Sequence, residues 1–149
     1  MSFFKQFENS IILHKSDKNT FSMIPSKDYF VGNTPHGGYL TAVMQKALSL
    51  SMPHQHVINS NTLYLDRTEP EEIIVQVKKI RESRGSSVGK VTLIQDKKSR
   101  CMMTGICSDF NFMKGVSDLE TSPSKTFDED RDLFISLNFD NTKEDLTPS

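Results

Sequence analysis

The residues best placed to do chemistry stand together in the segment GNTPHGGYLTAVMQKALSLSMP, which runs from Gly32 to Pro53. Within it, His36, Gly37 and Gly38 precede a run of apolar residues. Two adjacent glycines at the start of a helix let a ligand approach the backbone closely, because no side chain stands in the way. No Asp or Glu occurs in 39–52, so the segment alone leaves open whether such a ligand is hydrolysed or only held.

A helix of about 14 residues from Gly38 must position these groups. The apolar residues that recur at helical spacing are Leu40, Val43, Met44, Ala47, Leu48 and Met52. This nearly continuous stripe predicts burial against a sheet. Pro53 ends the helix, because the residue before a proline is pushed out of the helical region.

Extended segments are expected on both sides of this helix. They are 10–15 and 19–24 before it, with 32–35 as a loop, and 57–65, 72–80, 88–95 and 100–110 after it. The polar turns ESRGSS and DKKS separate the last three segments, which indicates an antiparallel meander. The order of strands, one long helix and four more strands predicts an α+β fold.

The composition fits one domain in 1–110, followed by an acidic tail or linker in 111–149. The chain has 149 residues, of which 36% are hydrophobic and 25% charged, as in a globular protein. The tail holds nine acidic and four basic residues, a net charge of −5, whereas 1–110 carries +4. A mildly basic body can attract a phosphorylated ligand, but it is too weakly basic to predict nucleic-acid binding. The tail's apolar patch at 133–135 is a candidate docking element.

The cysteines, the histidines and the lack of long apolar runs predict an intracellular protein with reduced thiols and without a metal. Cys101 and Cys107 lie six residues apart on one expected strand and therefore share a face, which predicts core thiols. No run of about 18 apolar residues exists, so no membrane insertion is expected. The first residues lack the pattern of a secretory signal, and we expect a cytoplasmic location. His54 and His56 have no third ligand nearby, which argues against a metal site.

Three segments of the sequence carry a family resemblance. They are PHGGYLTAVMQKAL, INSNTLYLDRTEP and VKKIRESRGSSVGKVTLIQDKKS. In this order they resemble the N-terminal half of the double-hotdog acyl-CoA thioesterases, the thioesterase II-like proteins, over about 10–110. The positions typical of the family are Gly37, Gly38, Ser60, Tyr64, Arg67, Arg81, Ser87 and Gln95. The resemblance implies a hotdog fold, an antiparallel sheet wrapped around one long central helix, and hydrolysis of an acyl-CoA thioester to free acid and CoA.

The resemblance also implies a role for the helix start. The first backbone N–H groups of a helix lack internal partners and sit at the positive end of its dipole. The N–H groups around Gly37, Gly38 and Tyr39 would polarise a thioester carbonyl and hold its developing oxyanion. The alternative is that the two glycines merely permit tight packing of the helix on the sheet.

The sequence departs from the family at the catalytic groups. Double-hotdog thioesterases resemble two fused repeats and carry their water-activating side chains in the second, for which the 39 residues of the tail are too few. Many single-repeat hotdog thioesterases carry an Asp or Glu about two turns into the helix. That position here is Gln45, whose amide cannot accept a proton at neutral pH but can orient water.

Other polar residues have two interpretations each. His36 can act as an acid–base group or position a ligand, since imidazole titrates near neutrality; it can equally be a loop residue bonded to backbone. Asn59 and Asn61 alternate onto one strand face, where they can donate to an acyl carbonyl or serve the structure.

Charged and buried polar residues complete the set of candidates. Arg67 or Arg84 would lie near the CoA phosphates. Asp66 is a strand-end surface residue or a substitute base supplied by a partner subunit. Gln95 is expected to satisfy buried backbone groups.

Three functions remain open at this point. The first is acyl-CoA hydrolysis by a homodimer without a cofactor, with strand 57–65 at the open sheet edge and Gly37 and Gly38 facing 59–66 of the partner. The second is a non-catalytic acyl-CoA-binding or interaction subunit, favoured by Gln45. The third, a dehydratase acting on a 3-hydroxyacyl thioester, needs a His and an acid on facing elements, and the helix lacks the acid. The acyl chain length is not fixed by the sequence.

Overall fold

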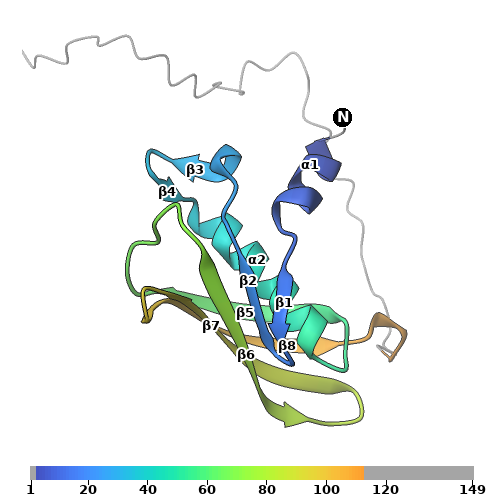
Figure 1. The fold of residues 1–149 in the computed structure, drawn as a ribbon. Coiled ribbons are helices and arrows are strands. Elements are labelled where there is room, and N and C mark those ends of the chain that lie inside the picture. The colour runs from blue at the N-terminus through green and yellow to red at the C-terminus, as the bar shows by residue number, and fades with distance from the viewer. Residues whose placement is uncertain (1–2, 113–149) are drawn as a thin grey trace, which may run out of the picture. The chain divides into compact units, whose positions relative to one another are not determined.

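The apolar stripe of the long helix, α2 (Gly37–Ser51), organises the molecule. The structure, a computed structural model, describes residues 3–112. In it α2 lies across the concave side of one curved antiparallel sheet (Figure 1). The other elements are α1 (Phe3–Ser10), β1 (His14–Asp17), β2 (Thr20–Met23), η1 (Lys27–Tyr29), β3 (Phe30–Val31), β4 (Thr34–Pro35), β5 (His56–Tyr64), β6 (Ile73–Glu82), β7 (Ser86–Gln95), β8 (Lys98–Ser108) and η2 (Phe110–Phe112).

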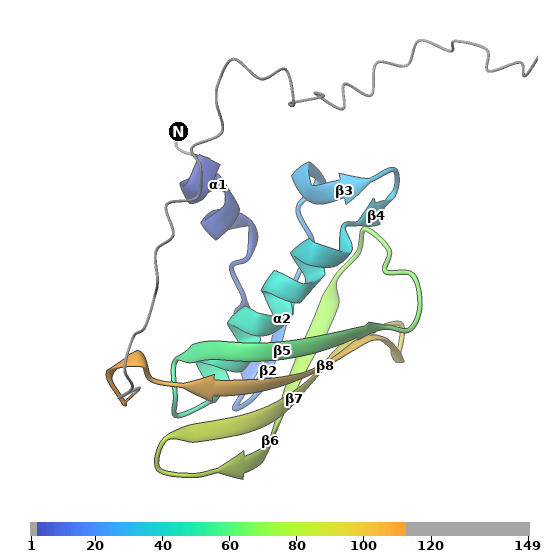
Figure 2. The same cartoon turned by 180° about the vertical axis from the view of Figure 1, so that it is seen from behind.

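The six-stranded sheet has the order β1-β2-β6-β7-β8-β5. All of its pairings are antiparallel, and β6, β7 and β8 form the meander expected from the polar turns. The β7–β8 turn places Asp96 and Lys97 at positive φ, as a two-residue hairpin turn of this hand requires. One edge of the sheet is β5, which Figure 2 shows in front of α2. This confirms the edge position expected for 57–65.

The core lies between α2 and the concave face of the sheet. All six apolar residues of the expected helical stripe are buried there, and Val43, Met44, Ala47 and Leu48 have 0% exposure. The alternating residues Ile73, Val75 and Val77 face them from β6. The thiols of Cys101 and Cys107 are free and buried, as their spacing predicted.

Both ends of α2 follow from local chemistry. His36 is the N-cap, and its extended backbone delivers the chain into the helix. Met52 is the C-cap with ψ 152, because Pro53 excludes the helical conformation at the preceding residue.

Two parts of the N-terminal region differ from the sequence expectation. The strand expected at 10–15 is wrong in its first half, since α1 occupies the chain up to Ser10 and β1 begins at His14. The segment 32–35, expected as a loop, contains β4 and pairs with β3 as a small hairpin around Gly32, whose φ is +63. The tail from 113 onward, with its patch at 133–135, lies outside the described residues.

None of the helices in the described part of the chain has the length and apolar character needed to span a membrane.

Candidate active site

The N-terminus of α2 is capped by a side chain rather than left open. The Nδ1 atom of His36 accepts a hydrogen bond from the Gly38 N–H at 3.1 Å. Since Nδ1 acts as an acceptor, a neutral His36 carries its proton on Nε2, which is then a donor. His36 is therefore a loop residue bonded to backbone, and its free ring edge still offers one polar atom.

Two backbone N–H groups in the first turn of α2 have no hydrogen-bond acceptor in the described part of the chain. The Leu40 N–H makes the first helical bond, to the His36 carbonyl, at 3.1 Å. The N–H groups of Gly37 and Tyr39 have no acceptor among residues 3–112. Of the three N–H groups suggested for an oxyanion, these two have no acceptor in the described part of the chain, and that of Gly38 donates to the cap.

Tyr64, at the end of β5, packs directly on Gly37. Its hydroxyl donates to the Gly37 carbonyl at 2.8 Å, and a Cβ at Gly37 would lie 3.0 Å from Tyr64 Cζ. A side chain at Gly37 would thus push against the tyrosine ring. Gly37 thus permits close packing, because it admits the Tyr64 ring. Its N–H has no acceptor among residues 3–112, and the oxyanion role stays a prediction.

A row of polar contacts continues from this point along α2 and β5, and we call it the polar row. Its helix members are Gly37, Thr41 and Gln45, and its strand members are Tyr64, Thr62 and Ser60. Four residues of helix advance about 6 Å and two residues of strand about 6.6 Å, so the two spacings stay matched over two helical turns. Neither Thr41 nor Thr62 was anticipated from the sequence, although their matched spacings are visible in it.

The contacts of the polar row are short at both ends. Thr41 Oγ1 lies 2.7 Å from the Tyr64 hydroxyl and 3.4 Å from Thr62 Oγ1. Gln45 Nε2 donates to Ser60 Oγ at 2.8 Å. Gln45 Oε1 and the Ser60 proton have no partner among the described residues, so together they offer one acceptor and one donor.

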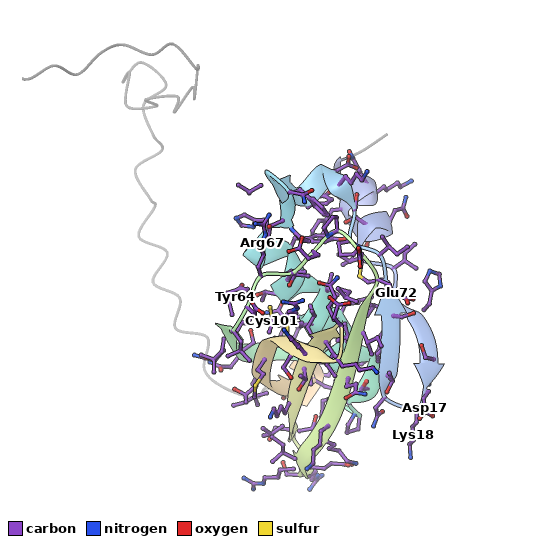
Figure 3. The ribbon with its side chains drawn as sticks, turned by 60° about the vertical axis from the view of Figure 1, so that its left-hand side comes forward. Asp17, Lys18, Tyr64, Arg67, Glu72 and Cys101 are labelled. Carbon is purple, nitrogen blue, oxygen red and sulfur yellow. The ribbon has the colours of Figure 1, made fainter. Side chains whose placement is uncertain are left out.

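An open pocket of about 630 Å³ lies beside Tyr64, the residue that contacts Gly37. It lies between the β3–β4 hairpin and the segment that follows β5, and Tyr64, Leu65 and Arg67 line one side of it. Figure 3 shows Tyr64 and Arg67 on the same side of the molecule, away from Asp17 and Lys18. Arg67 Nε donates to Thr34 Oγ1 and lies 3.7 Å from a carboxylate oxygen of Glu69. Its two Nη atoms make no hydrogen bond among residues 3–112.

The second arginine suggested for CoA lies elsewhere. Arg84 belongs to the β6–β7 turn, and its carbonyl is 3.3 Å from Nε2 of the buried His54, which follows the C-terminal end of α2. Arg67 reaches Thr34, just before the N-terminal end of α2. Within one chain, only Arg67 adjoins the helix start, and Arg84 is not brought to it.

Asn59 does not join the polar row, and within one chain it is not brought to the helix start. In the ladder with β8, Ser60 and Thr62 pair with Gly105 and Met103, which face the core, whereas Asn59 and Asn61 pair with the outward-facing Ile106 and Thr104. A β-bulge between Val57 and Asn59 precedes this stretch. Side chains alternate along a strand, so both asparagines are exposed on the outer face.

Asp66 is engaged within its own chain. The Arg67 N–H and the Arg100 guanidinium bind its two carboxylate oxygens at 2.8 and 2.7 Å. These contacts, the Arg67 N–H first, lower the pKa of the Asp66 carboxyl below its ordinary value. The carboxylate is thus an ionised strand-end group, and the structure supports the simpler of its two interpretations.

Gln95 has the structural role expected for it. Its amide accepts from the Glu69 N–H and donates to the carbonyls of Glu69 and Glu71. It therefore fixes the segment that leads from the pocket into β6. Among the described residues, no group of three His, Cys, Asp or Glu side chains is arranged to hold a metal ion.

Comparison with known proteins connects this geometry to a family. A family model for the acyl-CoA thioesterase N-terminal domain matches residues 25–108, more than half of the chain. The chain belongs to this family. The match contains the β3–β4 hairpin, α2 and the four strands that follow it, and thus the whole polar row. None of the curated proteins compared with this sequence matches it.

Solved structures agree on the fold. A thioesterase II-type protein from Thermobifida fusca has a TM-score of 0.69 at 16% identity, over 74% of this chain and 41% of that protein. A hotdog-fold protein from Alicyclobacillus acidocaldarius has a TM-score of 0.63 at 18% identity, over 70% and 39% of the two chains. A Streptococcus mutans protein solved with acetyl-CoA has a TM-score of 0.57 at 16% identity, over 64% and 85%. The fold is therefore a hotdog, and this chain spans about two fifths of the first two proteins.

Proposed function

We propose that the protein hydrolyses an acyl-CoA thioester to a free acid and CoA at the N-terminus of α2. The observation that carries this proposal is the pair of unpaired backbone donors, Gly37 and Tyr39, beside an open pocket in an acyl-CoA thioesterase domain. The bound acetyl-CoA of the Streptococcus mutans structure supports the ligand class. CoA is part of the substrate, so the reaction needs no cofactor.

The donors at the helix start act on the thioester carbonyl. Water attacks the carbonyl carbon, and the carbonyl oxygen becomes an oxyanion that the Gly37 and Tyr39 N–H groups stabilise. The C–S bond then breaks, and the electron pair leaves with the CoA sulfur, which takes up a proton as the acid forms. Removal of one such donor in an enzyme typically costs about 10²–10³ in kcat.

Gln45 and Ser60 orient the water in this proposal. Gln45 Oε1 accepts a hydrogen bond from the water, and the Ser60 hydroxyl, which already accepts from Gln45 Nε2, donates to the water oxygen. An amide does not take up the proton at neutral pH, so the pair positions water without being a general base. Arg67 binds a CoA phosphate through its free Nη atoms, a geometry that suits arginine.

A second function, a non-catalytic acyl-CoA binder, is favoured by one observation. The helix position at which a carboxylate would activate water holds Gln45, and the nearby Asp66 is held in its own ion pair with Arg100. Such a protein would bind the thioester at the same helix terminus and release no thiol.

A thiol-release assay with acetyl-, butyryl- and octanoyl-CoA separates the two functions. Hydrolysis predicts CoA thiol above the buffer rate, and Tyr64→Ala should leave the release measurable, because the donors are backbone groups. A melting shift without thiol release supports the binder; ligand at about 100 times its dissociation constant stabilises a protein by about 2.7 kcal/mol. Neither thiol release nor a shift with any of the three esters would contradict both functions.

A further inference from the structure

We infer that the acyl group accepted by this site is short and carries a hydroxyl or carbonyl oxygen, rather than being a long saturated chain. The inference rests on the proposed function and concerns the same site. It follows from two features of α2, the packing of its buried face and the chemistry of the face toward β5.

The space beneath α2 is already filled by its own side chains. The Cδ1 atom of Leu48 lies 2.6 Å from where a Cβ of Gly89 would stand, and its Cδ2 fills the corresponding place at Gly105. These glycines are direct partners in the β7–β8 ladder, so they form one notch that holds Leu48. Met44 beside it has 0% exposure. A long alkyl chain cannot enter between helix and sheet without displacing these residues.

In this inference CoA occupies the pocket beside Arg67, and the path of the acyl group follows the polar row, the other surface that adjoins Gly37. One turn beyond Gly37, the path meets Thr41 and Thr62, and a further turn on it meets Gln45. An alkyl chain laid here would cover hydroxyl and amide groups without replacing their bonds to water, which is unfavourable for each group left unpaired.

The Thr62 hydroxyl is the group of the polar row nearest to Gly37 that a ligand oxygen can still satisfy. Tyr64 uses its proton on the Gly37 carbonyl, and Thr41 lies at 2.7 Å from the Tyr64 oxygen. Thr62 has only the 3.4 Å contact with Thr41, which is at the limit of a hydrogen bond. A hydroxyl or oxo group on the acyl chain, one helical turn from the oxyanion site, replaces this weak contact with a good one.

Isosteric ligands and an isosteric variant test the inference. Binding of butyryl-, 3-hydroxybutyryl- and octanoyl-CoA to the full chain is measured by calorimetry, and thiol release is measured in parallel. We expect 3-hydroxybutyryl-CoA to bind roughly five- to tenfold more tightly than butyryl-CoA, the factor that one neutral hydrogen bond contributes. Thr62→Val should abolish this ratio. Thr104→Val, the same change on the outer face of β8, should preserve it.

Each outcome decides between the possibilities. Tightest binding of octanoyl-CoA with thiol release intact overturns the inference and leaves the proposed function standing. An equal loss of the ratio in Thr62→Val and Thr104→Val also overturns it, because a general effect on the fold would then be responsible. If no ester binds and no thiol appears, the proposed function and the inference fall together.

Discussion

At the scale of single residues, the role proposed for Gln45 gives a direct prediction. Its amide nitrogen lies 2.8 Å from Ser60 Oγ. Gln45→Glu places a carboxylate at the position of this amide, whereas the side chain in Gln45→Asp is one methylene shorter. A carboxylate there accepts a proton from water, and general-base catalysis typically contributes 10²-fold or more. We therefore expect thiol release to rise by about 10²-fold in Gln45→Glu.

The control for this prediction is the neighbouring exposed residue on the same helix. Lys46→Glu introduces a carboxylate that points to solvent and should leave the rate unchanged. A Gln45→Glu protein that is folded, as circular dichroism would show, and releases no more thiol than the wild type would contradict the role assigned to Gln45.

Asp66 gives a second prediction at this scale, which concerns pH. The Arg67 N–H and Arg100 lower its pKa below the ordinary value of 3.8. Its contribution to stability is therefore present above the ordinary pKa and is lost as pH falls through the lower, folded-state pKa. Urea unfolding at pH 7 and pH 3 should show a smaller fall in stability for Asp66→Asn than for the wild type. Equal falls would show that this carboxylate is not coupled to folding.

The residues of the candidate site were only partly predictable from sequence. His36, Gly37 and Gly38 were found because a helix start has a recognisable pattern. The interpretation of Asn59 stayed open because β5 alternates without a clearly buried apolar face, and a bulge shifts its phase. Since a shift of one residue exchanges the two faces of a strand, the inward position belongs to Ser60.

At the scale of elements, the packing of α2 on the sheet depends on two glycines. A methyl group at Gly105 would collide with Leu48, and overpacking of this kind typically costs about 1–3 kcal/mol. Gly105→Ala should therefore lower the free energy of unfolding by this amount in urea titration. Leu48→Ala should cost less stability in the Gly105→Ala protein than in the wild type, because it removes the methyl groups that collide with the new Cβ.

The matched control for this prediction is Gly85→Ala. Gly85 lies in the β6–β7 turn, where an added Cβ would meet no atom within 4 Å. Its substitution should leave stability nearly unchanged. Independent, additive effects of Gly105→Ala and Leu48→Ala would mean that the two residues are not in steric conflict.

Helices and strands were predictable from the sequence where their apolar pattern continues over many residues. The helix and the four strands after it repeat their apolar residues over enough positions to identify both type and extent. The eight-residue α1 is too short for such a signal and depends on tertiary contacts. Phe7 meets Tyr29 edge-on at 5.5 Å, and Tyr39 donates to the Ser10 carbonyl at 2.6 Å. Contacts between residues so distant in sequence cannot be predicted from a local sequence pattern.

At the scale of the whole molecule, the two edges of the sheet differ in chemistry. The edge strand β1 carries His14, Lys15 and Asp17 and is exposed throughout, and such charged edges resist pairing with another strand. The other edge, β5, exposes Ile58 and Leu63. Of the two edges, β5 is thus the one suited to pair with a second sheet.

This asymmetry bears on how a dimer would form. The sequence suggested that Gly37 and Gly38 face 59–66 of a partner, but in this structure Gly37 contacts Tyr64 of its own chain. The polar row is complete within one chain and lies beside the open β5 edge. We propose that a second copy pairs antiparallel along β5, so that the two polar rows flank one seam that is shielded from bulk solvent.

This proposal predicts a homodimer that one substitution on β5 weakens. Light scattering after size exclusion should give twice the chain mass of 16.9 kDa. Ile58→Lys places a charge on the open edge and should shift the protein toward the monomer and reduce thiol release. Ile74→Lys on β6 is the matched control, because both isoleucines are 40% exposed but Ile74 is paired on both sides, with Ser22 and Ile94. A wild-type protein that runs as a 16.9 kDa monomer at micromolar concentration would exclude the dimer; an active monomer would show further that one polar row is sufficient for the reaction.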